Sequence, residues 1–269
     1  MGFVAEGDPR SDCSTLIMPA ISLGNVGQLA VDLLVSSTIA ERVGYLDDPF
    51  VLPCVGNDAY SPSNPGKLAL PLEVYEAPTL GITLIEQRSP VVKGMMIDFG
   101  RNLTNFAISS KKKHAIILSS LDFGRWKSIE TSSDIYYISS TNSNGTDDEC
   151  ERLGWKRLQD YNPAQPSWKL LTDLAECDET SESSLPDEDD LEQEDYYATL
   201  PFAALFSCLK AKGLKVTCLL CYCSEGDNTG DAFRLAEAAL KLNGCEGVEW
   251  KIPYSWRTVY GPPPDMSMF

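Results

Sequence analysis

Short, nearly continuous apolar runs recur along the chain and predict strands that are buried on both faces. The three strongest are residues 15–22 (TLIMPAIS), 115–119 (AIILS) and 214–223 (LKVTCLLCYC). Weaker β-like segments, punctuated by Pro, Gly and Asn, occupy residues 43–46, 50–55, 68–77, 81–87 and 135–139. All of these runs are far shorter than the roughly 20 residues needed to cross a bilayer, so no membrane association is expected.

Apolar residues with helical spacing lie between these runs. The first helix follows a glycine-containing turn at residues 24–27, and its predicted buried stripe comprises Val26, Leu29, Ala30, Leu33, Leu34 and Ser37. Val31 and Val35 lie on another side of the same helix. We therefore expect this helix either to be deep in the core or to cover a partner's surface as well.

Three further helices are expected. Pro90 is placed to open one that continues to about Ser110, and residues 196–212 form another. The last begins at Thr229 as N-cap and ends at Asn243 and Gly244. Its predicted buried stripe is Ala232, Leu235, Ala236, Ala239 and Leu240, with Glu237 and Lys241 paired on the solvent side.

Strands that alternate with helices indicate an α/β fold. Helices would cover both faces of a central β-sheet, and the β-rich middle of the chain favours a mixed sheet over a purely parallel one. We expect residues 1–269 to form a single domain, interrupted by an insertion and ending in a tail at residues 261–269.

The insertion is defined by charge. Residues 176–195 hold eleven acidic and no basic residues, which leaves only −6 of the formal net charge of −17 for the rest of the chain. Such a segment cannot bury enough apolar surface to offset the entropy of ordering, so we expect it to be disordered. An acidic protein repels phosphate backbones, and nucleic-acid binding is therefore not expected.

Nine cysteines at irregular spacings, without a signal peptide, indicate free thiols in the cytoplasm and nucleus. Cys218, Cys221 and Cys223 resemble a metal-binding knuckle. On a strand, however, Cys218 faces away from the other two, and structural zinc requires four ligands. The pattern favours a hydrophobic strand, and we expect no metal and no cofactor.

Two loops could bind a small molecule. The turn Gly24-Asn25-Val26-Gly27 joins a strand to a helix but lacks the first glycine of a dinucleotide fingerprint and has no Walker lysine. Residues 224–228 (SEGDN) follow the strongest strand, where open α/β sheets bind ligands, and Glu225 or Asp227 could hold a hydroxyl or a metal. The simpler interpretation is a tight turn in the first case and a solvated loop in the second.

Histidine-based hydrolysis has little support. His114 is the only histidine, it lies at the start of a strand, and the chain contains no Gly-x-Ser-x-Gly nucleophile motif.

A longer stretch is more specific than any of these motifs. Residues 16–34 (LIMPAISLGNVGQLAVDLL) closely resemble the N-terminal signature of the PAC2 family of proteasome assembly chaperones. Residues 51–57, 224–228 and 250–257 resemble the same family. The candidate family-signature or partner-interface residues are Gly24, Asn25, Gly27, Val31, Val35 and Trp256.

The resemblance implies a topology related to nucleoside phosphorylases without their catalytic residues, and a chaperone rather than an enzyme. It implies a heterodimer with proteasome assembly chaperone 1 that scaffolds the seven-membered α-ring of the 20S proteasome. This heterodimer would prevent off-pathway dimerisation of the ring and premature binding of activators.

The resemblance also bears on the tail. In some family members a C-terminal hydrophobic–Tyr–any motif enters pockets between α-subunits, which makes Met266, Ser267, Met268 and Phe269 candidate binding residues. Here Ser267 and Met268 replace the hydrophobic residue and the tyrosine of that motif.

Two other functions stay open. One is a nucleoside-phosphorylase-like enzyme that binds a nucleoside or phosphate at the carboxyl ends of the strands. The other is an adaptor whose acidic insertion captures basic ligands.

Overall fold

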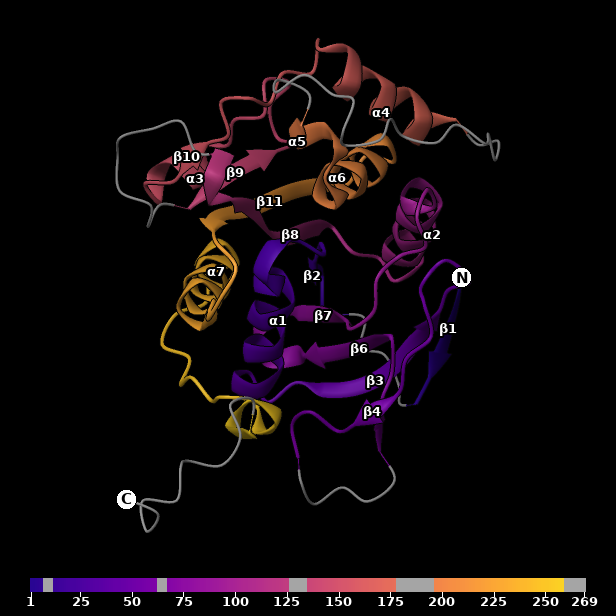
Figure 1. Ribbon diagram of the computed structural model, residues 1–269, viewed down its shortest axis with the longest axis vertical. Helices are drawn as coiled ribbons and strands as arrows, with labels where there is room; N and C mark the ends of the chain where they lie inside the picture. The colour runs from indigo at the N-terminus through magenta and orange to yellow at the C-terminus, as the bar shows by residue number, and fades with distance from the viewer. Residues whose placement is uncertain (7–11, 62–66, 126–134, 178–195, 259–269) are drawn as a thin grey trace.

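A nine-stranded mixed sheet runs through the computed structural model, in the order β1-β3-β6-β7-β2-β8-β11-β9-β10 (Figure 1). The structure describes residues 1–6, 12–61, 67–125, 135–177 and 196–258. The strands of this sheet are β1 (Gly2–Ala5), β2 (Thr15–Pro19), β3 (Glu41–Asp47), β6 (Leu72–Ala77), β7 (Ile82–Gln87), β8 (His114–Asp122), β9 (Tyr136–Ser139), β10 (Lys156–Arg157) and β11 (Lys215–Cys223). Two short strands, β4 (Gly56–Asn57) and β5 (Leu68–Ala69), pair separately.

The centre of the sheet is parallel, antiparallel pairs lie on both sides of it, and the edge strand β10 pairs in parallel with β9. Strand β2 pairs in parallel with both β7 and β8, and β8 pairs in parallel with β11. Strands β1, β3, β6 and β7 form antiparallel pairs along one side, and β9 runs antiparallel to β11 on the other. The predicted mixed sheet is confirmed. The predicted likeness to the topology of nucleoside phosphorylases stays a prediction.

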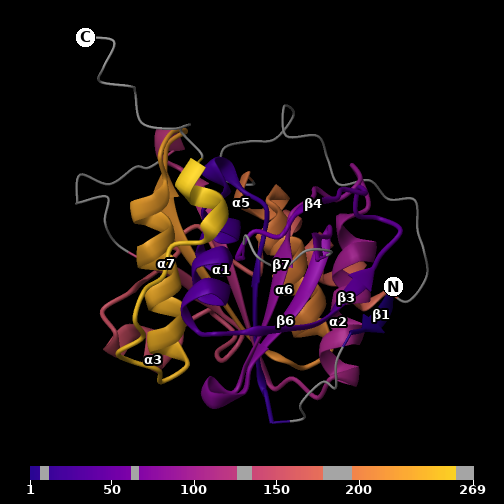
Figure 2. The same ribbon diagram turned by 90° about the horizontal axis from the view of Figure 1, so that it is seen from below.

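Helices cover both faces of the sheet (Figure 2). On one face lie α1 (Val26–Ser37) and α7 (Thr229–Leu242), which pack against each other. On the other face lie α2 (Met96–Ser109), α4 (Pro166–Glu176), α5 (Tyr196–Thr199) and α6 (Pro201–Ala211). The short helix α3 (Asp148–Arg152) follows β9, and the 3₁₀ helix η5 (Tyr254–Thr258) lies beyond α7.

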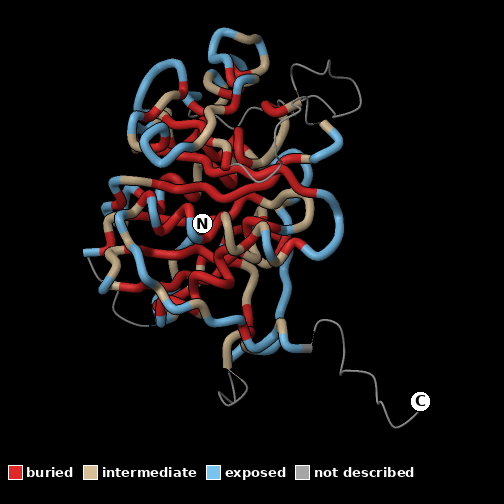
Figure 3. Tube along the Cα trace, turned by 90° about the vertical axis from the view of Figure 1, so that its left-hand side faces the viewer, coloured by how far each residue is buried: buried red, intermediate tan, exposed pale blue. Residues whose placement is uncertain are grey.

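The sheet separates two apolar cores, because successive side chains of a strand point to opposite faces. Leu16 and Met18 of β2 belong to the core under α2 and α6, whereas Ile17 belongs to the core under α1 and α7. Buried residues accordingly follow the central strands and the inner sides of the helices (Figure 3). Among the described residues, no helix is long and apolar enough to span a membrane.

Three predicted elements are wrong in extent. Residues 50–55 form no strand beyond an isolated bridge between Val51 and Val91. Pro90 does not open a helix, because its carbonyl accepts from Leu52 N at 3.0 Å and holds the backbone extended; α2 begins only at Met96. The helix predicted at 196–212 is broken between α5 and α6, where Pro201 lacks an amide and instead opens α6.

Two predicted regions lie outside the described residues. These are the acidic insertion, of which only Glu176 and Cys177 are described, and the tail at 261–269. The predictions for both regions, including those for Met266, Ser267, Met268 and Phe269, stay predictions.

Candidate functional site

The space beside the turn that precedes α1 is occupied by other atoms of the chain. Gly24 and Asn25 have positive φ angles of 65° and 53°. A Cβ on Gly27 would lie 2.3 Å from the carbonyl oxygen of Leu118 on β8, so α1 approaches the sheet as closely as a glycine allows. Ser120 Oγ donates to the carbonyl of Leu23 at 2.5 Å and fixes the turn to the same strand. The geometry matches the predicted tight packing of helix on strand.

The second candidate loop meets this turn. A Cβ on Gly24 would lie 2.2 Å from Nδ2 of Asn228, a buried residue just before α7. Asp227 Oδ1 accepts from the amide and the hydroxyl of Thr229, at 3.0 and 2.6 Å, and so satisfies the first free amide of α7. The N-cap of α7 is Asn228, so the predicted N-cap Thr229 is wrong by one residue. Two stretches some 200 residues apart are thus brought together for packing and capping. Glu225 lies exposed beside them.

The cysteines and the histidine occupy structural positions. Cys218 belongs to one core and Cys221 and Cys223 to the other, which confirms their predicted alternation. Within the described ranges no group of three or more His, Cys, Asp or Glu could hold a metal ion. Burial, followed by the charge of Lys215, lowers the pKa of His114 to about 4, and its Nε2 lies 2.9 Å from Thr217 Oγ1. His114 is therefore neutral at physiological pH.

The remaining signature residues lie under or beside α1. The side chains of Val31 and Val35 are buried in the core between α1 and the sheet. Of the two alternatives for this helix, the structure supports the deep core position. Trp256, on η5, is half-buried and packs against the same core. Their role in partner binding stays a prediction.

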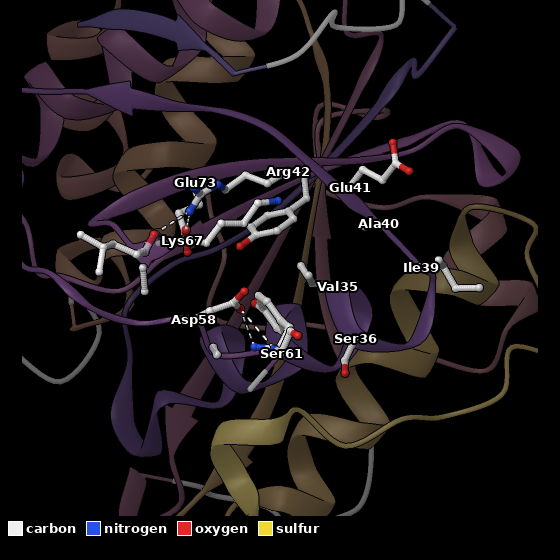
Figure 4. A pocket seen from close by; sticks show the side chains of 15 residues that line it. Val35, Ser36, Ile39, Ala40, Glu41, Arg42, Asp58, Ser61, Lys67 and Glu73 are labelled. Atoms are coloured by element: carbon white, nitrogen blue, oxygen red, sulfur yellow. Dashed lines mark hydrogen bonds and ion pairs between the residues drawn. The ribbon is translucent and has the colours of Figure 1, made fainter. Parts of the chain in front are cut away.

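A pocket of about 470 Å³ opens beyond the C-terminal end of α1, between β3, β6 and residues 58–61 (Figure 4). The rings of Tyr60 and Tyr75 meet edge to face inside it, with centroids 5.6 Å apart. Val35 of α1 lines one wall, and Ile39 and Leu68 stand exposed at its rim. The lining thus combines aromatic rings with charged side chains, among them Arg42, Asp58 and Glu73.

A buried polar cluster supports the pocket from behind. Arg88 Nε donates to Glu73 Oε2 at 3.0 Å, and its Nη2 donates to Asp32 Oδ1 at 3.2 Å and to the hydroxyl of Tyr60 at 3.0 Å. The Tyr60 hydroxyl donates in turn to Asp32 Oδ1 at 2.6 Å. Arg42 Nη1 donates to the other oxygen of Glu73 at 2.6 Å. We call Asp32, Arg42, Tyr60, Glu73, Glu86 and Arg88 the Arg88 cluster.

Glu86 is the exceptional member of the Arg88 cluster. It is paired with Glu73 across β6 and β7, is only 1% exposed, and its Oε2 has no hydrogen-bond partner in the described part of the chain. Burial, then the charge of Asp32, raise the pKa of this carboxyl well above its ordinary value, and Glu73 adds to this; Arg88 opposes the shift.

The raised pKa of Glu86 predicts how stability depends on pH. Because the folded pKa exceeds the unfolded one, the free energy of unfolding should fall as pH rises from about 4.5 toward the folded pKa, by about 1.4 kcal/mol for each pH unit. Glu86→Gln removes this titration. The free energy of unfolding of Glu86→Gln, relative to that of the native chain, should increase as pH rises from 4.5 to 8. Urea unfolding of both proteins between pH 4.5 and 8 measures the difference, and parallel profiles would contradict the prediction.

Neither the Arg88 cluster nor the pocket was predicted from the sequence. The available signal was an acidic residue at position 73 and another at 86, each between apolar residues of a predicted strand. Charged side chains that are buried need partners, so such positions predict a polar cluster. The identities of the partners depend on the tertiary fold.

Comparisons with known proteins identify relatives of this chain along most of its length. A model of the PAC2 family matches residues 16–244. Proteasome assembly chaperone 2 of Danio rerio is 28% identical over 96% of each chain, and that of Xenopus laevis is 30% identical over 96% of each chain. The protein of the same name from Nematostella vectensis is 32% identical over 82% of this chain and 85% of its own.

Solved structures share the fold. PbaA of Pyrococcus furiosus, described as an archaeal homolog of proteasome-assembly chaperone, superimposes with a TM-score of 0.60 at 17% identity and covers 91% of this chain and 88% of its own. PbaB of the same organism, described as an archaeal proteasome activator, gives a TM-score of 0.57 at 13% identity, over 91% and 90% of the two chains. With the family model matching more than 80% of its length, this chain belongs to the PAC2 family.

Proposed function

We propose that this chain is a subunit of a proteasome assembly chaperone and that it acts by binding other polypeptides. The observation that carries the proposal is similarity along almost the whole chain, 96% of it, to relatives named proteasome assembly chaperone 2. The shared fold of PbaA supports the same assignment.

In its finer form, the proposal pairs this chain with proteasome assembly chaperone 1 in the cytoplasm and nucleus. The heterodimer holds α-subunits of the 20S proteasome in a ring, prevents the ring from dimerising off the assembly pathway, and delays activators. Residues 266–269 are proposed to contact the α-subunits, and their removal should weaken capture of α-subunits while leaving the heterodimer intact.

The local geometry supports binding rather than catalysis. At the turn before α1, the space beside Gly24 is filled by Asn228 and the space beside Gly27 by the backbone of Leu118. The carboxylate of Asp227 accepts from the first amide of α7. The loops that could have held a nucleoside or phosphate are therefore used for packing.

Co-expression tests the proposal. Tagged chain would be expressed with proteasome assembly chaperone 1 and α-subunits, captured, and separated by size exclusion. We expect all three components in one complex and no tagged chain in mature 20S particles. If the chain elutes by itself with both candidates present, the proposal is wrong.

A further inference from the structure

The chain contains the dipeptide Asn-Gly at two places, Asn144-Gly145 and Asn243-Gly244. The first lies in the turn between β9 and α3, and the second follows the end of α7. An asparagine before glycine is open to attack on its own side chain, because glycine has no side chain to keep its amide nitrogen away from the carboxamide. The contacts of each carboxamide therefore decide how readily each asparagine reacts.

The reaction is a deamidation that needs only water. The amide nitrogen of the glycine loses its proton and attacks Cγ of the asparagine, and the bond from Cγ to Nδ2 breaks. Nδ2 leaves as ammonia with that proton, and a cyclic imide remains. Water then opens the imide at either carbonyl and gives aspartate or isoaspartate. Overall, a carboxamide and water become a carboxylic acid and ammonia.

The contacts of Asn144 favour this attack. Its Oδ1 accepts from the amide nitrogen of Thr146 at 3.2 Å and from the hydroxyl of Thr146 at 2.7 Å. Because a backbone amide can only donate, the atom that faces it is the carboxamide oxygen. This oxygen becomes negative when Cγ is attacked, so the two donors act as an oxyanion hole does. Asn144 is also exposed, which gives water access to the imide.

The contacts of Asn243 oppose the same attack. Its Nδ2 donates to the carbonyl of Leu80, just before β7, at 3.0 Å. A carbonyl can only accept, so the atom held there is the nitrogen that has to leave. Asn243 is half-buried between the end of α7 and this segment. Its carboxamide is thus fixed through the leaving group and not through the oxygen.

The attacking nitrogens do not account for a difference between the two places. Gly145 N donates to the carbonyl of Asn142 at 3.0 Å, and Gly244 N donates to the carbonyl of Lys241 at 3.0 Å. Both glycines have a positive φ, 85° and 73°. The side-chain contacts of the two asparagines are therefore the feature that distinguishes them.

We propose that Asn144 is a site of spontaneous deamidation in the folded chain and that folding protects Asn243. The product carries a new negative charge on an exposed turn. Isoaspartate also adds one carbon to the backbone before Gly145, whose carbonyl accepts from Ser139 N at 3.0 Å and whose α-carbon packs against the ring of Tyr161. The modification therefore changes both the charge and the packing of this turn. The inference is independent of the proposed function.

The two asparagines can be compared within one sample. The purified full-length chain would be kept at neutral pH and sampled over weeks, and peptide mass spectrometry would measure asparagine, aspartate and isoaspartate at positions 144 and 243. The matched control is the same chain unfolded in urea, where both dipeptides lose their contacts and should react at similar rates. In the folded chain Asn144 should react at least about tenfold faster than Asn243, because one place stabilises the oxyanion and the other holds the leaving nitrogen. If folding leaves the ratio of the two rates unchanged, or favours Asn243, the inference is wrong.

The variant Thr146→Val tests the role of the hydroxyl donor. Valine keeps the shape and the backbone amide but removes the shorter of the two hydrogen bonds to Asn144 Oδ1. Water replaces part of the lost donor in an exposed turn, so deamidation at Asn144 should slow by about three- to tenfold, less than when an enzyme loses an oxyanion donor. Thr172→Val, which loses a hydroxyl on α4, is the control and should react at the native rate. Deamidation of Thr146→Val at the native rate or faster would overturn the inference.

Discussion

Replacing Arg88 by Met is expected to destabilise the chain by about 3–5 kcal/mol, because it leaves buried carboxylates without their counter-charge. Arg88 donates to Glu73 and Asp32, whose side chains are only 2% and 11% exposed. Methionine preserves much of the volume but none of the donors. Since small domains are stable by only about 5–15 kcal/mol, this loss is a large share of the total.

Urea unfolding monitored by circular dichroism measures the effect of Arg88→Met. Arg234→Met is the matched control, because Arg234 forms an ion pair with Asp231 on α7 and its side chain is 41% exposed. An exposed pair of this kind contributes about 0–1 kcal/mol. Arg88→Lys keeps the charge and should give an intermediate loss. Equal stability of the two methionine variants would show that the Arg88 cluster is not a stabilising unit.

The second large effect is expected from Gly27→Ala, with a loss of about 3 kcal/mol, at the upper end of the cost of overpacking a core. The added Cβ would lie 2.3 Å from the Leu118 carbonyl oxygen and 3.3 Å from Cβ of Pro19. Neither β8 nor β2 can move away, because both are inner strands of the sheet. The helix must therefore shift outward and lose packing.

A second glycine provides the comparison for Gly27→Ala. Gly230 lies in the first turn of α7, and a Cβ there would meet no atom within 4 Å. Gly230→Ala should stabilise the helix by about 0.5–1 kcal/mol, because alanine loses less backbone entropy on folding. Thermal unfolding of both variants decides the matter, and the same sign of change at both positions would contradict the packing argument.

The central strands were predictable because each is apolar on both faces, as β2, β8 and β11 show. The helices α1 and α7 were predictable from periodicity, and the expected ion pair of Glu237 with Lys241 forms at 3.0 Å. The predicted bounds of helices were wrong where a proline could either open a helix or interrupt it. Proline at position 201 interrupts an apolar helical pattern, and proline at position 90 belongs to an extended segment instead of a helix.

The candidate site was less predictable because tertiary contacts build it. Arg88 meets Asp32 across 56 positions of sequence and Tyr60 across 28. The pocket likewise joins the end of α1 to β3 and β6. A charged residue between the apolar residues of a strand indicates that its side chain has polar partners. Only the topology of the sheet identifies these partners. The positive φ of Ile39, 54°, could not be predicted from the sequence, since it depends on how α1 connects to β3.

The mass in solution of the complex between this chain and proteasome assembly chaperone 1 tests most directly whether this chain acts by binding another polypeptide. The purified chain and purified proteasome assembly chaperone 1 would be mixed in equal amounts and passed over a sizing column with light-scattering detection. We predict one peak whose mass equals the sum of one copy of each chain. Two peaks, each with the mass of a separate protein, would contradict the view that this chain works by pairing with other polypeptides.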